Sequence, residues 1–164
     1  MDAKEFKHRY YPFHPKLYRV AYALLNRAED AEDILQETYC KLWLKRDELT
    51  AIRQPEAFCM TLVKNLCLDF LRASARRKGC EPEAVPVIPV EVTPESELES
   101  KEQLAHIESL IDRLPEKQRV VLRMRGFGDC SLEEIETATG ESAVNVRVLL
   151  SRARKTLKEM LRKQ

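Results

Sequence analysis

The amino-acid sequence predicts an all-α fold with two small helical domains joined by a flexible acidic linker. Apolar residues recur at helical spacing in two blocks, and no Val/Ile-rich stretch alternates with the period of two typical of strands. Between the blocks, residues 81–100 contain four prolines, six glutamates and no basic or aromatic residue. Such a segment cannot continue a helix or build a core, so we expect domains at residues 1–80 and 101–164.

Three amphipathic helices are predicted in the first domain. The first ends near Asn26, the second begins with a cap-like Asp30, and the third begins at Pro55, a favourable first-turn residue, with a basic tail from Arg72 to Lys78. Their apolar stripes are, in chain order, Leu17, Val20, Ala21, Leu24 and Leu25; Ala31, Ile34, Leu35, Thr38 and Leu42; and Phe58, Cys59, Leu62, Leu66 and Phe70.

The second domain has the pattern of a helix-turn-helix motif. Apolar spacing predicts a helix before Pro115 and another before a turn at residues 126–129. Ser131 and Glu134 form a capping box for a short helix, and a turn at residues 139–142 leads into a basic last helix. The apolar residues expected inside are Leu104, Ile107, Ile111, Leu114, Val120, Val121, Met124, Val146, Leu149, Leu150, Ala153, Leu157 and Met160.

The balance of 28 basic against 27 acidic residues hides a strong asymmetry along the chain. Residues 1–80 carry 15 basic and 11 acidic side chains, the linker 0 and 6, and residues 101–164 carry 13 and 10, which gives +4, −6 and +3. Each basic block could therefore bind a polyanion.

Several function classes are not expected. Five cysteines without a CxxC pair predict neither a disulfide framework nor a zinc site and fit a reducing cytosol. The absence of an apolar N-terminal region and of a stretch of about 20 apolar residues predicts a cytoplasmic protein without membrane insertion. Three scattered histidines, and no Gly-rich phosphate loop, predict no enzyme, cofactor or metal.

Three helix faces are candidates for function. On the last helix, polar residues lie off the apolar stripe and could contact bases and phosphates, although a solvated basic helix end is the alternative. They are Asn145, Arg147, Ser151, Arg152, Arg154 and Lys155. On the third helix, Thr61, Lys64, Asn65, Leu68 and Arg72 are expected opposite the core, where an ordinary surface is the alternative.

The second helix presents Asp33, Gln36, Glu37 and Lys41 outward. Carboxylates repel DNA, so a basic protein partner is expected, with a solvated face held by a Glu37–Lys41 pair as the alternative.

Together these segments resemble a known family. DAEDILQETYCKLW at Asp30–Trp43 and PEAFCMTLVKNLCLDFLR at Pro55–Arg72 resemble the second region of extracytoplasmic-function sigma factors. LPEKQRVVLRMRGFGDCSLEEI at Leu114–Ile135 and NVRVLLSRARKTL at Asn145–Leu157 resemble their fourth region. The resemblance departs from the family pattern at Glu136, a normally small position, and at Ala138, a normally larger one.

The resemblance implies a subunit that binds core RNA polymerase and directs promoter-specific initiation. It places Asp33, Gln36 and Glu37 on the clamp helices of the largest subunit, the fourth region on the flap of the second subunit, and the linker towards the RNA exit path. It places Asn65 at the minus-ten element, a flipped base in the loop at residues 45–54, and Arg147, Ser151 and Arg152 at the minus-thirty-five element. It also allows for an anti-sigma factor as partner.

Two rival functions remain open at this point. A stand-alone helix-turn-helix regulator would use the first domain to sense a signal or to dimerise. A helical adaptor would bind only protein.

Overall fold

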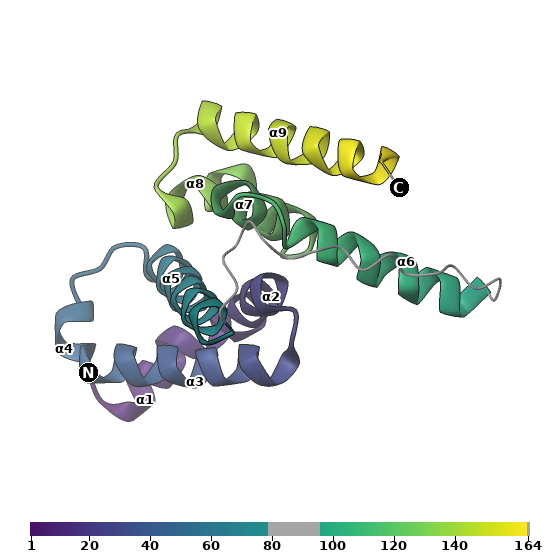
Figure 1. Cartoon of the computed structure of the whole chain (residues 1–164). Coiled ribbons are helices and arrows are strands. Elements are labelled where there is room, and N and C mark those ends of the chain that lie inside the picture. Colours follow the sequence, from purple (N-terminus) through teal and green to yellow (C-terminus); the bar gives the residue numbers. More distant parts are fainter. Residues whose placement is uncertain (79–95, 164) are drawn as a thin grey trace.

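A computed structural model describes residues 1–78 and 96–163 of the chain, and these residues form helices and short connecting turns (Figure 1). The predicted all-α class is thus confirmed for the part of the chain that is described. The N-terminal half contains α1 (Ala3–Tyr10), a 3₁₀ turn η1 (Tyr11–Phe13), α2 (His14–Leu25), α3 (Ala28–Leu44), α4 (Arg46–Leu49) and α5 (Pro55–Arg77). The C-terminal half contains α6 (Ser96–Ile111), α7 (Glu116–Gly126), α8 (Leu132–Thr139) and α9 (Ala143–Arg162).

Most of the predicted linker, residues 81–95, lies outside the described residues. Its last five residues do not fit the expectation of an extended chain, because α6 already begins at Ser96. The last proline of the segment is Pro94, so every residue of α6 has the backbone N–H group that a helix needs.

The core of the N-terminal half forms where α2 packs against both α3 and α5. The predicted stripes of α2 and α3 are all buried, because residues spaced at three and four positions share one face of a helix. α1 covers one end of this core, where Phe6 packs edge-on against Trp43 with ring centroids 5.3 Å apart.

The ends of these helices follow local chemistry, with one correction. Asn26 ends α2 in the left-handed conformation (φ 57°), which asparagine tolerates well, and its N–H donates to the Tyr22 carbonyl. α3 begins at Ala28 rather than at the predicted Asp30, with extended Arg27 as its N-cap. Asp30 instead lies in the first turn, where a carboxylate is favoured by the helix dipole.

α5 differs most from the sequence expectation, because it is buried on two sides. Cys59 and Leu66 are buried as predicted, but Phe58 is 37% exposed. Leu68, which was expected opposite the core, is buried instead. The reason is that α5 packs against α2 and α3 on one side and against α8 on the other.

The helix-turn-helix of the C-terminal half is built as the sequence predicts. The side chain of Ser131 and the side chain of Glu134 cap α8 reciprocally. Gly140 ends α8 with φ 75°, a conformation that favours glycine, and the chain then turns into α9. At the two positions where the sequence departs from the family pattern, Ala138 is buried and Glu136 is half-buried.

α6 is joined to the rest of this half only near its C-terminal end. Leu110, Ile111 and Leu114 are buried, and α6 packs against α9. Leu104, predicted to face a core, is 51% exposed because the preceding part of α6 extends away from the other helices (Figure 1).

The turn after α7 requires glycine at position 128. A Cβ atom there would lie 2.8 Å from the backbone oxygen of Met124, whereas one on Gly126 would meet nothing within 4 Å. We expect Gly128→Ala to lower the free energy of unfolding by about 1 to 3 kcal/mol, as overpacking does. Gly126→Ala is the matched control and should be neutral or slightly stabilising in urea denaturation. Equal stabilities of the two variants would contradict the close approach.

Candidate functional site

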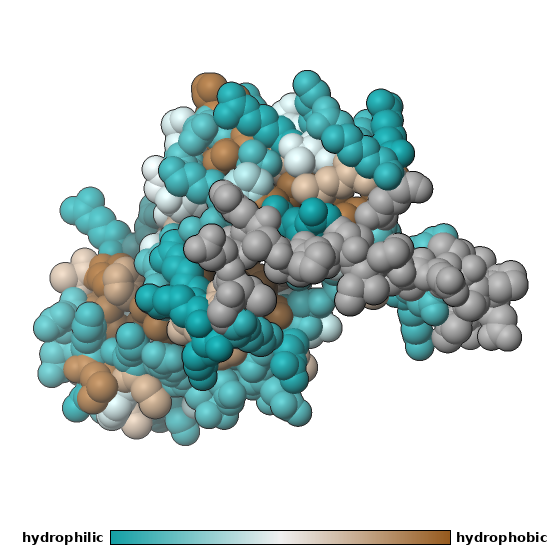
Figure 2. All heavy atoms as spheres, viewed as in Figure 1, coloured by the Kyte–Doolittle hydropathy of each residue, from teal (hydrophilic) through white to brown (hydrophobic). Residues whose placement is uncertain are grey.

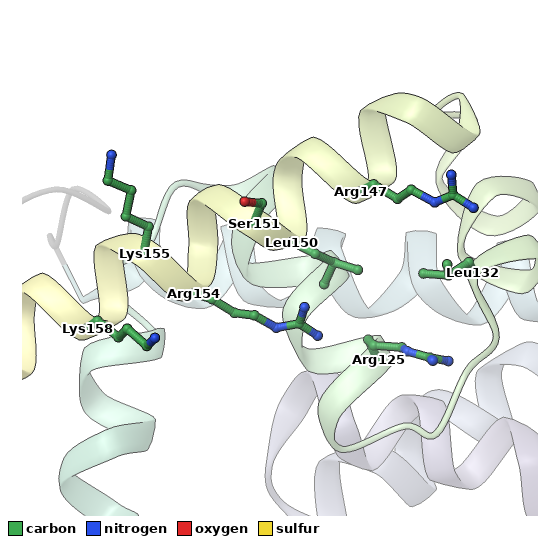
Figure 3. A pocket seen from close by; sticks show the side chains of 8 residues that line it. All are labelled: Arg125, Leu132, Arg147, Leu150, Ser151, Arg154, Lys155 and Lys158. Carbon is green, nitrogen blue, oxygen red and sulfur yellow. The ribbon is translucent and has the colours of Figure 1, made fainter.

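A basic groove runs along one side of α9 (Figure 3). It has a volume of about 510 Å³, and none of the eight lining residues is acidic. Arg147 and Arg154 extend from α9 and Arg125 extends from α7 towards the same hollow (Figure 3). The lining residues are Arg125, Leu132, Arg147, Leu150, Ser151, Arg154, Lys155 and Lys158. Five cations without a carboxylate form a surface suited to the phosphates of nucleic acid.

The predicted residues of the last helix differ in exposure and in hydrogen bonding. Arg147, Ser151, Arg152 and Lys155 are exposed, as a DNA-reading face requires. Asn145 is half-buried, and its amide already donates to Glu141, so its donor is engaged within the protein.

Sequence reasoning missed Arg125, because this residue reaches the groove from another helix. Its guanidinium donates to the Cys130 carbonyl at 2.9 Å, which fixes it beside the turn before α8. The spacing of residues along α9 cannot indicate that a cation from α7 lies beside that helix. Arg154 also lines the groove, and its place in the basic run of the last helix indicated this role in the sequence.

The predicted DNA-binding face of α5 is partly occupied by the C-terminal half, although Arg72 and Asn65 remain exposed. Arg72 forms two hydrogen bonds with the Glu116 carboxylate, at 2.8 and 2.9 Å. The Thr61 hydroxyl lies 3.5 Å from the Thr137 carbonyl of α8. Lys64 is half-buried, and burial lowers the pKa of its ammonium group. Asn65 is exposed.

The acidic face of α3 is exposed. Asp33, Gln36 and Glu37 all lie on the solvent side, and Figure 2 shows mostly hydrophilic atoms over α3 at the bottom of the view. The predicted Glu37–Lys41 pair is present at 3.9 Å, but both side chains are about half exposed. Such a pair contributes little to stability, so Glu37 as well as Asp33 gives the face its acidic character.

The segment between α3 and α5 is held from the N-terminus. The Arg9 guanidinium donates to the carbonyls of Ile52, at 2.9 Å, and Leu49, at 3.4 Å. Leu49 is buried, and the Arg46 guanidinium lies 4.1 Å from the centroid of the Trp43 ring. These contacts fix the shape of residues 45–54, the loop expected to receive a base.

The two halves meet along a seam that we define by the contacts of α2 and α5 with α7 and α8. Its most buried charge is Arg123, which is 3% exposed. Its guanidinium donates to Asp112 at 2.7 Å and, across the seam, to the Ala23 carbonyl of α2 at 3.4 Å. The apolar core is continuous across this seam, so the halves share one core.

Comparisons with known proteins identify both halves of the chain. The family described as Sigma-70 region 2 matches residues 10–77, and Sigma-70, region 4 matches residues 104–157. RNA polymerase sigma factor SigV of Bacillus subtilis is 29% identical over 156 residues, which cover 90% of this chain and 85% of SigV. ECF RNA polymerase sigma factor SigW of the same organism is 26% identical, over 90% of this chain and 83% of SigW.

The chain belongs to the extracytoplasmic-function sigma factors. It therefore directs promoter-specific initiation of transcription through RNA polymerase, and its homologues are sigma factors rather than enzymes. The fold is similar to that of the sigma factor RpoE of Bartonella quintana, solved in complex with the anti-sigma factor NepR. That similarity has a TM-score of 0.65 and 24% identity, and it covers 98% of each chain.

In this sigma factor, the N-terminal half thus corresponds to region 2 and the C-terminal half to region 4. Among the described helices, none combines the length and the apolar character needed to span a membrane.

The buried guanidinium of Arg123 gives a test of the seam. Asp112→Asn removes the carboxylate from a cation that is 3% exposed, so we expect the free energy of unfolding to fall by about 1 to 3 kcal/mol. Adding Arg123→Met to that variant should recover part of the loss, because no buried charge then lacks a partner.

Glu108→Gln is the control for this test. It changes a charge on the neighbouring turn of α6, but a glutamine can still accept the hydrogen bond from the Asn26 amide. Urea denaturation should find this variant close to the unsubstituted protein. If Glu108→Gln lowered the free energy of unfolding as much as Asp112→Asn does, the contact between Asp112 and Arg123 would not be the cause of the loss.

Proposed function

We propose that this sigma factor uses three helix faces to bind three different partners. The acidic face of α3 binds core polymerase, the face of α5 contacts the minus-ten element, and the basic groove of α9 contacts the minus-thirty-five element. The separation of charge supports this division most strongly. The face of α3 exposes carboxylates, whereas five cations and no carboxylate line the groove at α9.

The α3 face suits a basic protein surface such as the clamp helices of the largest subunit. Asp33 and Glu37 are exposed and carry negative charge that would repel DNA phosphates. Gln36 lies between them and adds an amide that can donate and accept hydrogen bonds. Region 4 would contact the flap of the second subunit.

The DNA faces differ in the kind of recognition that they support. Arg147 and Ser151 lie in a groove on a helix-turn-helix, whose second helix enters the major groove of duplex DNA. Asn65 is exposed on α5 near Lys64 and Arg72, and its amide suits a base or a backbone in melted DNA. The loop at residues 45–54, whose shape Arg9 supports, would receive a flipped base.

Further assignments rest on the family. We propose one domain at residues 1–80, a second domain that begins with α6, a tether between them, and action in the cytoplasm, where core polymerase works. By analogy with RpoE, which was solved with NepR, an anti-sigma factor is a further proposed partner. We propose no catalytic role for the chain.

The rival functions can be separated by an electrophoretic shift on promoter DNA with and without core polymerase. A sigma factor needs core to shift a promoter fragment, a stand-alone regulator shifts DNA alone, and an adaptor shifts neither. The two matched family regions support the first outcome.

The α3 assignment predicts that Glu37→Lys weakens holoenzyme formation, because it reverses one charge in an acidic contact. Gln36→Ala should weaken it less. Glu159→Lys, which reverses an exposed charge on α9, is the control. A pull-down with core polymerase measures the effect, and we expect roughly a ten-fold loss, equivalent to about 1.4 kcal/mol. Undiminished binding of both α3 variants would reject this face.

The two DNA faces predict separate promoter defects. Arg147→Ala should lower promoter binding and relax base preference in the upstream duplex element, by roughly 1 to 3 kcal/mol if the guanidinium binds a guanine at two points. Asn65→Ala should impair recognition or opening at the downstream element. Neither change should prevent assembly with core polymerase.

Transcription from promoter variants and permanganate footprinting measure these effects. Arg162→Ala, at the exposed end of α9 and outside the groove, is the control for Arg147. If Arg147→Ala altered downstream preference and left upstream preference intact, the assignment of the two faces would be wrong.

A further inference from the structure

The outward face of α9 begins with an apolar side chain. Val144 lies in the first turn of the helix and is 70% exposed, more than any other large apolar residue of region 4 that the structure describes. The buried side of α9 carries Val146, Leu149, Leu150 and Ala153. At about 3.6 residues per turn, position 144 lies on the opposite side of the helix. The core of the protein therefore does not account for this valine.

The same face of α9 carries residues that are already proposed to contact DNA. Arg147, Val148 and Ser151 follow Val144 at three, four and seven positions, the spacing of one helix face. Arg147 and Ser151 are exposed and line the basic groove, and Figure 3 shows Arg147 nearer the start of α9 than Ser151. Val144 extends this face to the N-terminal end of the helix.

The first turn of α9 is held in place by its own polar groups. The Ser142 hydroxyl accepts a hydrogen bond from the Asn145 backbone N–H at 3.1 Å, which caps the helix. The Asn145 amide donates to Glu141, whose carboxylate also pairs with Lys117 at 3.3 Å. The amide that could bind an adenine is thus engaged within the protein, and Val144 is the largest side chain that this turn exposes.

Helix stability does not favour valine at this position. A β-branched side chain loses rotamer freedom in a helix, and the helix dipole favours a carboxylate in the first turn. The helices α3, α5, α7 and α8 all have an acidic residue in their first turn, whereas α9 has none. A first turn without a carboxylate suits a helix end that approaches phosphates, because a carboxylate would repel them.

Duplex DNA offers one apolar group in its major groove, the 5-methyl group of thymine. In a helix-turn-helix, the N-terminal residues of the second helix contact base edges in that groove. A valine side chain has no hydrogen-bonding group, so its favourable contact with a base edge is apolar.

We propose that Val144 determines part of the promoter specificity by packing against the 5-methyl group of a thymine in the upstream duplex element. The proposal rests on the proposed role of the basic groove of α9 and deepens it. It adds an apolar contact to the polar contact of Arg147, so that the first two turns of α9 recognise two different bases.

The spacing along α9 limits where this thymine lies. Side chains three positions apart on a helix have Cβ atoms about 5 to 6 Å apart, and successive base pairs are about 3.4 Å apart. The thymine that Val144 contacts therefore lies within about two base pairs of the base that Arg147 contacts, on either strand.

The test uses holoenzyme assembled from the full chain and core polymerase, with a promoter that this holoenzyme selects from a library with a randomised upstream element. Each thymine of that element is replaced in turn by deoxyuridine, which removes the 5-methyl group and keeps the hydrogen-bonding groups of the base. The dissociation constant of the promoter is measured for the unsubstituted chain, for Val144→Ser and for Leu161→Ala. The last variant is the control, because it removes an exposed apolar side chain at the far end of α9.

We expect one thymine at which deoxyuridine weakens binding about three- to five-fold for the unsubstituted chain and for the control, the scale of one buried methyl group. Val144→Ser should lose most of this effect, because a hydroxyl replaces both methyl groups of the valine. The dependence of its affinity on salt concentration should not change, since Val144 contacts no phosphate. Its melting temperature should match that of the unsubstituted chain, because the side chain is 70% exposed.

Two results would overturn the proposal. One is an upstream element in which no thymine is sensitive to loss of its methyl group. The other is a methyl effect that persists in Val144→Ser or disappears equally in Leu161→Ala. Failure of the proposed role of the basic groove gives a different result, because Arg147→Ala would then leave promoter binding and upstream base preference unchanged as well.

Discussion

The double burial of α5 is the constraint on which the rest of the structure depends. One side of the helix completes the core with α2 and α3, and the other side packs against α8. Because Leu68 lies on this second side, the apolar core continues from region 2 into region 4. Arg123 can be buried at the seam only because that packing brings the Ala23 carbonyl within reach of its guanidinium.

Most of the local structure was predicted correctly from the sequence. The stripes of α2 and α3, the capping box at Ser131 and the turn at Gly140 depend on residues a few positions apart, and all were predicted. The start of α3 and the helical end of the expected linker were wrong, because helix boundaries depend on weak local preferences.

The candidate site was predicted less completely, because it depends on contacts between helices that are far apart in the sequence. A helical stripe shows which residues share a face but not what covers that face. Leu68 was therefore expected in solvent, although region 4 covers it, and Arg72 stays exposed but pairs with Glu116 of α7. Arg125 escaped notice because a different helix brings it to the α9 groove. The exposed faces of α3 and α9 were predicted because the helices that contact α3 and α9 pack on their other sides.

The hold of Arg9 on the loop before α5 has a consequence for protein engineering. A chimera that exchanged only this short segment with a relative would assume that the segment carries its own shape. Here residues 45–54 owe part of their shape to a side chain about 40 positions earlier, which binds the carbonyls of Leu49 and Ile52. A transplanted loop would therefore need a compatible α1 to travel with it.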